Sequence, residues 1–355
     1  MQGLFGAVWG LAGLVGPLVG GALVHTVGWR WVFWINLPFG LASAAVLAAA
    51  YHERPERHEH RLDVAGAVLL AVAVIAALLA APSRGAGVVA IPVAAAATAA
   101  FLAVERRARE PLLPLDLFGQ RVMAVSSAAG ALLGAAMLGT VTYVPLWVQS
   151  VLGLPPTSAG AAIAPMAVGW PIASAVSGRL VPRLGYRRLL FAGFALSAAA
   201  SVLLALSLRP GASLRSVQLL VALYGAGLGT CNPPLVIAIQ TSVPWSRRGV
   251  ATASTLFFRT IGGTLAVGLL GGVLANTLTG AGADPAFVER LLGPERVALE
   301  PAAVAAVSGT LQGAMSIVFW TAALIAVAAF VVVLFFPHVA IAPAGDPARS
   351  PSVPE

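Results

Sequence analysis

Arg259 is the one charged residue that lies well inside a long apolar segment, which we place at residues 250–276. A charge in the middle of a membrane span costs roughly 2.5–3.5 kcal/mol on insertion scales, so such a residue normally faces protein or water. We therefore predict that Arg259 has a functional role or belongs to a buried polar pair. The alternative is an arginine whose long side chain reaches back to the membrane surface.

The acidic residues are placed quite differently from Arg259. All thirteen Asp and Glu fall in expected loops, tails or helix ends, and Asp63 is the one closest to a span. Coupling transport to protons normally requires a carboxylate embedded in the membrane that titrates from each side in turn. We therefore expect that the chain as it stands does not run proton-coupled transport.

Several polar and aromatic residues lie near proline kinks or at span ends, where they could line a cavity for amphipathic compounds. Each could equally be an anchor at the membrane interface. These candidate cavity residues are Tyr143, Trp147, Gln149, Asn232, Gln240 and Trp320.

A short loop brings histidines and glutamates together, which raises the question of a metal site. A charged loop of alternating sign explains the same residues better, so we predict no bound metal and no cofactor. No phosphate-binding glycine loop and no catalytic triad context occurs, which argues against an enzyme or an ATP-driven pump. The residues of this loop are His52, His58 and His60 with Glu53, Glu56 and Glu59.

The elements that must position these residues are membrane helices. The chain is 59% hydrophobic and 10% charged, whereas soluble domains carry about 25% charged residues. Apolar runs long enough to cross the hydrocarbon layer recur along the chain. We predict an all-α polytopic membrane protein with about ten transmembrane helices, at residues 3–24, 31–51, 63–81, 86–103, 122–148, 158–178, 189–208, 214–241, 250–276 and 314–337.

The distribution of arginine predicts the orientation. All 21 basic residues are arginines, and the net charge is +8. Because they are dispersed in short loops between spans, they argue for membrane orientation and against nucleic-acid binding. With the N-terminus inside, fourteen arginines fall on the inner side and six on the outer side. We expect a multi-pass protein of the inner cell membrane with both termini cytoplasmic.

Small residues recur every four positions in the first apolar segment. Gly16 and Gly20 continue one stripe, and Pro17 and Gly21 belong to the adjacent one. Such stripes let a neighbouring backbone approach closely, and a proline bends the helix. Simple helix packing explains this spacing as well as a functional seam does.

The run Gly16-Pro17-Leu18-Val19-Gly20-Gly21, followed by Trp29-Arg30-Trp31-Val32-Phe33-Trp34-Ile35-Asn36-Leu37-Pro38, resembles the 14-span drug:proton antiporters of the major facilitator superfamily. The stretch from Arg259 to Thr264 is similar to the penultimate span of that family. A third segment resembles the superfamily's cytoplasmic loop signature, although Pro182 replaces the usual acid. Its candidate motif residues are Gly178, Arg183, Gly185, Arg187 and Arg188.

The resemblance implies a major-facilitator-type helix bundle whose glycine seam governs closure between two halves. It covers spans five to fourteen of such a protein, so we expect the first four spans, with their coupling acids, to be missing from this chain. It divides the chain into the remainder of an N-terminal half with linker spans (1–121, four helices), a C-terminal six-helix bundle (122–337) and a disordered cytoplasmic tail (338–355).

The implied function is secondary active transport, with export of an amphipathic small molecule in exchange for protons by alternating access. The partners are then the lipid bilayer, that substrate and protons. Two alternatives stay open: a permease for one specific metabolite, and a truncated remnant or partner subunit that does not transport.

Overall fold

The fold is given by a computed structural model that describes residues 15–16, 19–20, 23, 26–28, 30–50, 63–80, 84–108, 110–209, 211–292 and 308–339. All regular elements in these ranges are helices, as predicted. They are α2 (Trp31–Trp34), α3 (Asn36–Ala50), α4 (Val64–Ala80), α5 (Arg84–Glu105), η1 (Leu115–Gly119), α6 (Arg121–Ser150), α7 (Pro156–Ser207), α8 (Leu214–Ser242), η2 (Trp245–Arg247), α9 (Arg248–Gly280), α10 (Pro285–Leu292) and α12 (Ser308–Leu334).

The described helices confirm the membrane class. Seven of them are long and apolar enough to cross a membrane, and α4 is a shorter apolar helix. One of the seven, at Thr157–Ser207, is long enough for two crossings at about 1.5 Å per residue, and it contains two of the predicted segments. Apart from the first predicted segment, which lies mostly outside the described residues, every predicted span coincides with one of these helices.

The two spans of α7 join differently from the prediction. We expected a loop between residues 178 and 189, but helix continues through most of this stretch and is interrupted at Gly185. The backbone there has φ = 80°, a left-handed conformation that glycine adopts without a steric penalty. The chain therefore changes direction at Gly185, where we had expected a loop.

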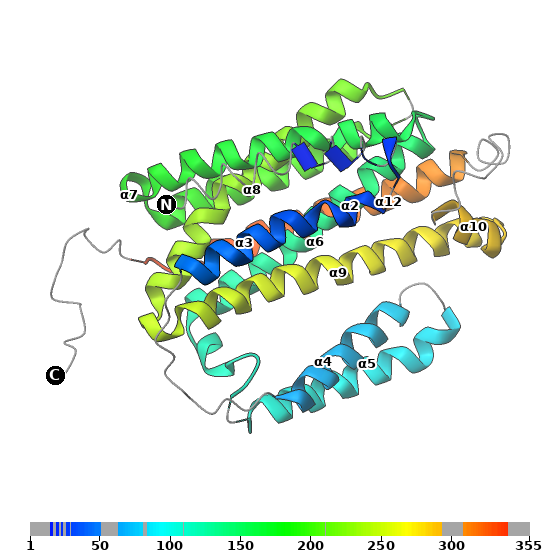
Figure 1. Cartoon of the computed structure of the whole chain (residues 1–355). Coiled ribbons are helices and arrows are strands. Elements are labelled where there is room, and N and C mark those ends of the chain that lie inside the picture. Colours follow the sequence, from blue (N-terminus) through cyan, green and yellow to red (C-terminus); the bar gives the residue numbers. More distant parts are fainter. Residues whose placement is uncertain are drawn as a thin grey trace, which may run out of the picture.

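The helices from α6 onward form a bundle. Figure 1 shows α7 and α8 along one side and α9 on the other, with α6 and α12 between them, and the main packed pairs are α7 with α8 and α6 with α9. Buried apolar side chains fill the interior in two clusters. One surrounds Phe194 and Leu228 near the Gly185 end, and the other surrounds Trp147 and Leu274.

Two glycines set how closely α6 and α9 approach. A Cβ added at Gly134 would overlap the backbone carbonyl of Arg259, and a Cβ added at Gly262 would overlap the backbone of Ala131. Close backbone approach of this kind is how small residues stabilise helix pairs in membranes. The α6–α9 contact therefore depends on both glycines.

The N-terminal helices lie outside this bundle. In Figure 1, α4 and α5 form a hairpin beside α9, and α4 contacts α9 where Leu78 approaches Gly268. Neither α2 nor α3 has a buried side chain. Their apolar side chains are therefore available to lipid or to other spans.

The α6–α9 contact yields a stability prediction. Gly262→Ala places a methyl group against the backbone of Ala131, and overpacking of this kind costs about 1–3 kcal/mol. We expect a lower midpoint of thermal unfolding for the purified protein in detergent. Gly249→Ala, on the same helix but with open space around its Cβ, is the matched control and should not lower the midpoint. Equal midpoints for the two variants would contradict the close approach.

Candidate functional site

Arg259 lies where three helices of the bundle converge. Its guanidinium Nη1 donates a hydrogen bond to Oδ1 of Asn232 on α8, at 3.2 Å. Its Cζ atom lies 5.7 Å from the centre of the Trp170 ring on α7, within the range of a cation–π interaction. Arg259 and Asn232 thus form a half-buried polar pair, and a functional role for Arg259 stays a prediction.

The backbone around this cluster is held from several sides. Gly134 of α6 packs against the Arg259 backbone, which fixes the position of α9 there. On α8, Pro234 has no N–H to donate to the carbonyl of Thr230, four residues earlier. The hydroxyl of Ser177 on α7 donates to that carbonyl instead, at 2.6 Å. The proline in α8 is thus accommodated by a hydrogen bond from its neighbouring helix.

The charge of Arg259 is stabilised by dipoles and by an aromatic ring rather than by an acid. Among the described residues, no Asp or Glu forms an ion pair with Arg259; the ion pair at the helix ends joins Arg247 and Asp116. A guanidinium carries five N–H donors, and the described structure shows one of them in a hydrogen bond. The site therefore has the chemistry to receive an anionic or hydrogen-bond-accepting group.

A second polar contact connects the same two helices. Nε2 of Gln240 on α8 donates to Oγ1 of Thr252 on α9, at 3.3 Å. Since Gln240 lies about two turns beyond Asn232, and Thr252 about two turns before Arg259, the two contacts lie along one α8–α9 boundary. We call these four residues the polar seam.

The other candidate cavity residues lie elsewhere. The Tyr143 hydroxyl donates to the carbonyl of Val267 at 2.7 Å. The indole of Trp147 is fully buried and donates to Oε1 of Gln312 at 3.0 Å. Tyr143 and Trp147 both belong to the apolar core. The side-chain amide of Gln149 donates a hydrogen bond to the carbonyl of Pro145 in its own helix. Trp320, on α12, is 40% exposed. The structure does not bring these four to Arg259, and their role as cavity residues stays a prediction.

The first glycine motif is described only in part. Gly16 and Gly20 have no atom of another element within 4 Å of a Cβ added there. Pro17 and Gly21 lie outside the described residues, as does the histidine loop at 51–62. The role of the glycine motif in closure between the two halves therefore stays a prediction.

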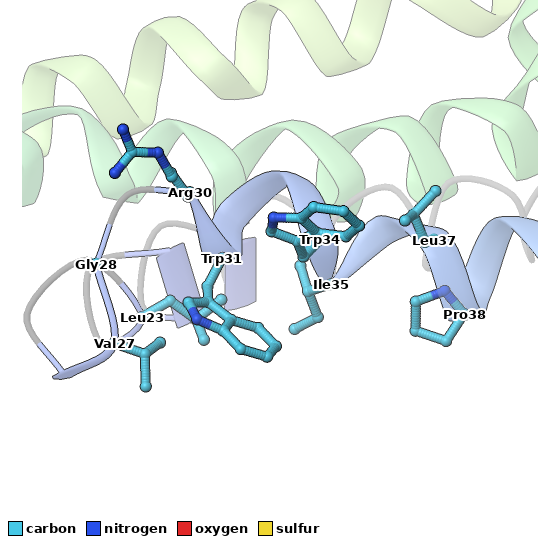
Figure 2. Close-up of a pocket in the computed structure, with 9 residues that line it drawn as sticks. All are labelled: Leu23, Val27, Gly28, Arg30, Trp31, Trp34, Ile35, Leu37 and Pro38. Carbon is cyan, nitrogen blue, oxygen red and sulfur yellow. The ribbon is translucent and has the colours of Figure 1, made fainter.

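The residues around and after this motif line a pocket of about 870 Å³. Figure 2 shows that Arg30 points away from Val27 and Trp31. All residues that line this pocket come from one short stretch of chain, so the pocket is a local hollow rather than a site between helices. They are Leu23, Val27, Gly28, Arg30, Trp31, Trp34, Ile35, Leu37 and Pro38.

The predicted loop motif lies around the break in α7. Arg183 and Arg188 are exposed, and a Cβ at Gly178 would have open space. The guanidinium of Arg187 lies 5.0 Å from the Phe191 ring and 3.2 Å from Nδ1 of His338. Arg187 thereby connects α7 to the segment after α12. The rest of the predicted tail, residues 340–355, lies outside the described residues.

Sequence reasoning missed Trp170, Ser177, Thr252 and Gln312. Trp170 carried a signal, because it is a hydrogen-bonding side chain inside a predicted apolar span, whereas Gln312 lies just before the last predicted span. Their partners could not be read from the sequence. No group of three or more metal-binding side chains occurs in the described part of the chain.

Comparison with known proteins places these features in context. A family model described as the Major Facilitator Superfamily matches residues 1–267. "Multidrug transporter protein MdtP" of Bacillus subtilis is 33% identical over 283 residues, which cover 77% of this chain and 52% of the relative. "Multidrug resistance protein Stp" of Mycobacterium tuberculosis is 30% identical over 284 residues, covering 78% and 52%. The chain thus spans about half the length of these curated relatives.

A solved structure shows a similar fold. It is a bacterial homolog of the human lysosomal transporter Spinster, in an inward-facing and unoccupied conformation. The TM-score is 0.51 and the identity 16%, and the match covers 93% of this chain and 66% of that chain. At this identity the likeness concerns the fold alone, and it agrees with the predicted helix bundle.

The Arg259–Asn232 hydrogen bond can be tested by a double-mutant cycle. Asn232→Ala removes the acceptor from a half-buried guanidinium, and hydrogen bonds to charged groups contribute about 1.5–3 kcal/mol. We expect this loss in the free energy of unfolding, measured by denaturant titration in detergent. In an Arg259→Met background the same substitution should cost little, because no buried charge is left without its acceptor. An equal cost in both backgrounds would contradict the pairing.

Proposed function

We propose a transport function from a premise that the match over three quarters of the chain establishes: this chain belongs to the Major Facilitator Superfamily. It is a multi-pass membrane protein, and we infer that it acts in secondary active transport. The substrate class is an amphipathic small molecule, exported in exchange for protons. The observation that carries the proposal is the similarity to relatives named as multidrug transporters over most of this chain.

The proposed mechanism is alternating access between two halves of a bundle. Residues 122–337 would form the C-terminal six-helix bundle, since α6, the two spans of α7, α8, α9 and α12 pack around common apolar clusters. Residues 1–121 would supply the remainder of the other half and the linker spans. The candidate glycine seam at Gly16 and Gly20 would govern their closure.

In this proposal Arg259 lines the substrate pathway. The bilayer would exclude an isolated charge from its lipid-facing surface, so Arg259 is directed toward protein or water. The neighbouring Trp170 ring offers an apolar face and the guanidinium a positive charge. The pair suits an amphipathic molecule, and its charge favours neutral or anionic substrates at this position.

Contacts at one end of the bundle support the proposed orientation. Arg121 donates to the carbonyl of Phe335 at 3.1 Å, and Arg187 contacts His338. These contacts gather the arginines of separate connections around the C-terminal end of α12. We place the protein in the inner cell membrane, and by the positive-inside rule this end of the bundle faces the cytoplasm.

A partner subunit or a remnant that does not transport alone stays an alternative proposal. A permease for one metabolite would require a charged central cavity, and Arg259 is the described charge that could supply it.

Export from cells distinguishes these functions. The chain, and the same gene with any coding sequence that lies in frame upstream of it, would be expressed in bacteria that lack their own efflux pumps. Protonophore-sensitive export of a fluorescent lipophilic dye from either strain supports proton-driven transport. Export from the chain alone would overturn the expectation that its coupling acids are missing. Absence of export from both strains would contradict the transport proposal and favour the non-transporting alternative.

The placement of Arg259 in the pathway has its own test. Export of an anionic and a cationic amphipathic dye would be measured side by side, and the ratio of the two rates is independent of the amount of protein. Arg259→Met should lower the anionic-to-cationic ratio by about tenfold, which corresponds to about 1.4 kcal/mol. Arg215→Met, which removes an exposed charge outside the motifs, is the control. An unchanged ratio in Arg259→Met would remove Arg259 from the pathway.

A further inference from the structure

Glu105, the last residue of α5, is a buried carboxylate. Its side chain is 3% exposed, although it lies where the sequence predicted the start of a loop. One oxygen, Oε2, accepts a hydrogen bond from the backbone N–H of Leu113 at 3.2 Å. The other oxygen, Oε1, is buried and has no hydrogen-bond partner. Buried oxygens without a partner are rare in folded proteins and require an explanation.

Asp63, just before α4, has the same arrangement. Its Oδ1 accepts a hydrogen bond from the backbone N–H of Gly66 at 2.8 Å, which caps the first turn of the helix. Its Oδ2 is buried and unpartnered. Each carboxylate therefore uses one oxygen for the backbone and leaves the other without a donor.

The two unpartnered oxygens face a common point. A Cβ at Gly66 would lie 3.2 Å from Glu105 Oε1 and still closer to Asp63 Oδ2. The two oxygens are therefore separated by less than twice that distance. Glycine at position 66 leaves the space between them open.

The described residues near the pair carry few positive charges. Helix α4 contains no charged residue. Beyond α5, Arg106 and Arg107 are both exposed, and Arg107 lines a pocket of about 280 Å³ together with Asp63. Neither arginine forms an ion pair with the two carboxylates within the described residues. Glu110, in the following segment, adds a further negative charge.

We propose that Asp63 and Glu105 bind one proton between them, as an acid pair at the end of the α4–α5 hairpin. One carboxyl group is protonated, and its O–H donates to the free oxygen of the other. Two neighbouring carboxylates, of which Glu105 is buried and Asp63 half-buried, resist ionising together, because each charge repels the other and burial removes hydration. The shared proton supplies the donor that both orphaned oxygens lack.

A proton fits this place better than a divalent cation. Calcium requires six to eight oxygen ligands, and magnesium an octahedral set that usually retains several waters. The pair offers two free oxygens, since the other two accept backbone hydrogen bonds.

The shared proton connects three segments. It joins the beginning of α4 to the end of α5, and Glu105 also holds the backbone of Leu113. Leu113 and Leu117 are both buried, and Leu117 belongs to the core cluster near the Gly185 end. The shared proton thereby adds to the contacts that attach the hairpin to the bundle. The proposal stands independently of what the protein transports.

Infrared spectroscopy of the purified full chain in lipid nanodiscs tests the pair. The C=O stretch of a protonated carboxylic acid is separate from that of a carboxylate and shifts in heavy water. We expect this band at neutral pH in the wild-type protein, with an amplitude that titrates as one proton. It should be lost in both Glu105→Gln and Asp63→Asn, because each variant supplies an amide donor and leaves one ionised carboxylate.

Three controls complete the test. Asp116→Asn, which alters an exposed acid paired with Arg247, should retain the band, and so should wild-type protein treated with a chelator or with added magnesium or calcium. Loss of the band on adding either metal would identify a cation site and overturn the proposal. A band that persists in Asp63→Asn would show that Glu105 is protonated by burial alone, which also overturns the pair. If Glu105→Gln fails to fold, the wild-type titration and Asp63→Asn still decide.

Discussion

The direct backbone contact between α6 and α9 is the constraint on which the rest of the bundle depends. Gly134 of α6 lies against the backbone of Arg259 on α9, and Gly262 of α9 lies against the backbone of Ala131 on α6. This contact fixes the rotation and height of α9 and thereby directs Arg259 toward α7 and α8. In a medium where apolar burial between helices gives little driving force, such close packing largely determines how helices associate.

The bundle accommodates polar groups by pairing them across helix boundaries. Arg259 finds Asn232, Gln240 finds Thr252, and the Thr230 carbonyl freed by Pro234 finds Ser177. Each of these groups would be costly to leave unpaired away from water. The polar seam joins α8 and α9, while Ser177 joins α7 and α8. A few polar side chains in largely apolar helices therefore connect α7, α8 and α9.

Hydropathy alone predicts most of the helices, because a span has to be apolar over a fixed length whatever its neighbours are. It does not predict partners. Arg259 was identifiable as a buried charge, yet Trp170 and Asn232 reach it only through the helix packing. Tyr143 and Trp147 are residue types that often line substrate cavities. In the structure their polar atoms donate hydrogen bonds to the carbonyl of Val267 and to the side chain of Gln312. The burial of Glu105 and the helix interruption at Gly185 likewise follow from the backbone conformation, which hydropathy does not predict.

The position of Arg259 within a membrane-spanning helix has an electrical consequence. A charge that moves through the whole membrane exchanges about 2.3 kcal/mol with the membrane potential for every 100 mV. Arg259 lies in the interior of α9, and no described carboxylate pairs with it to cancel the charge. Any rearrangement that shifts α9 along the membrane normal therefore moves net charge through the field. The resting voltage of the cell then becomes one of the forces that select among conformations of the bundle.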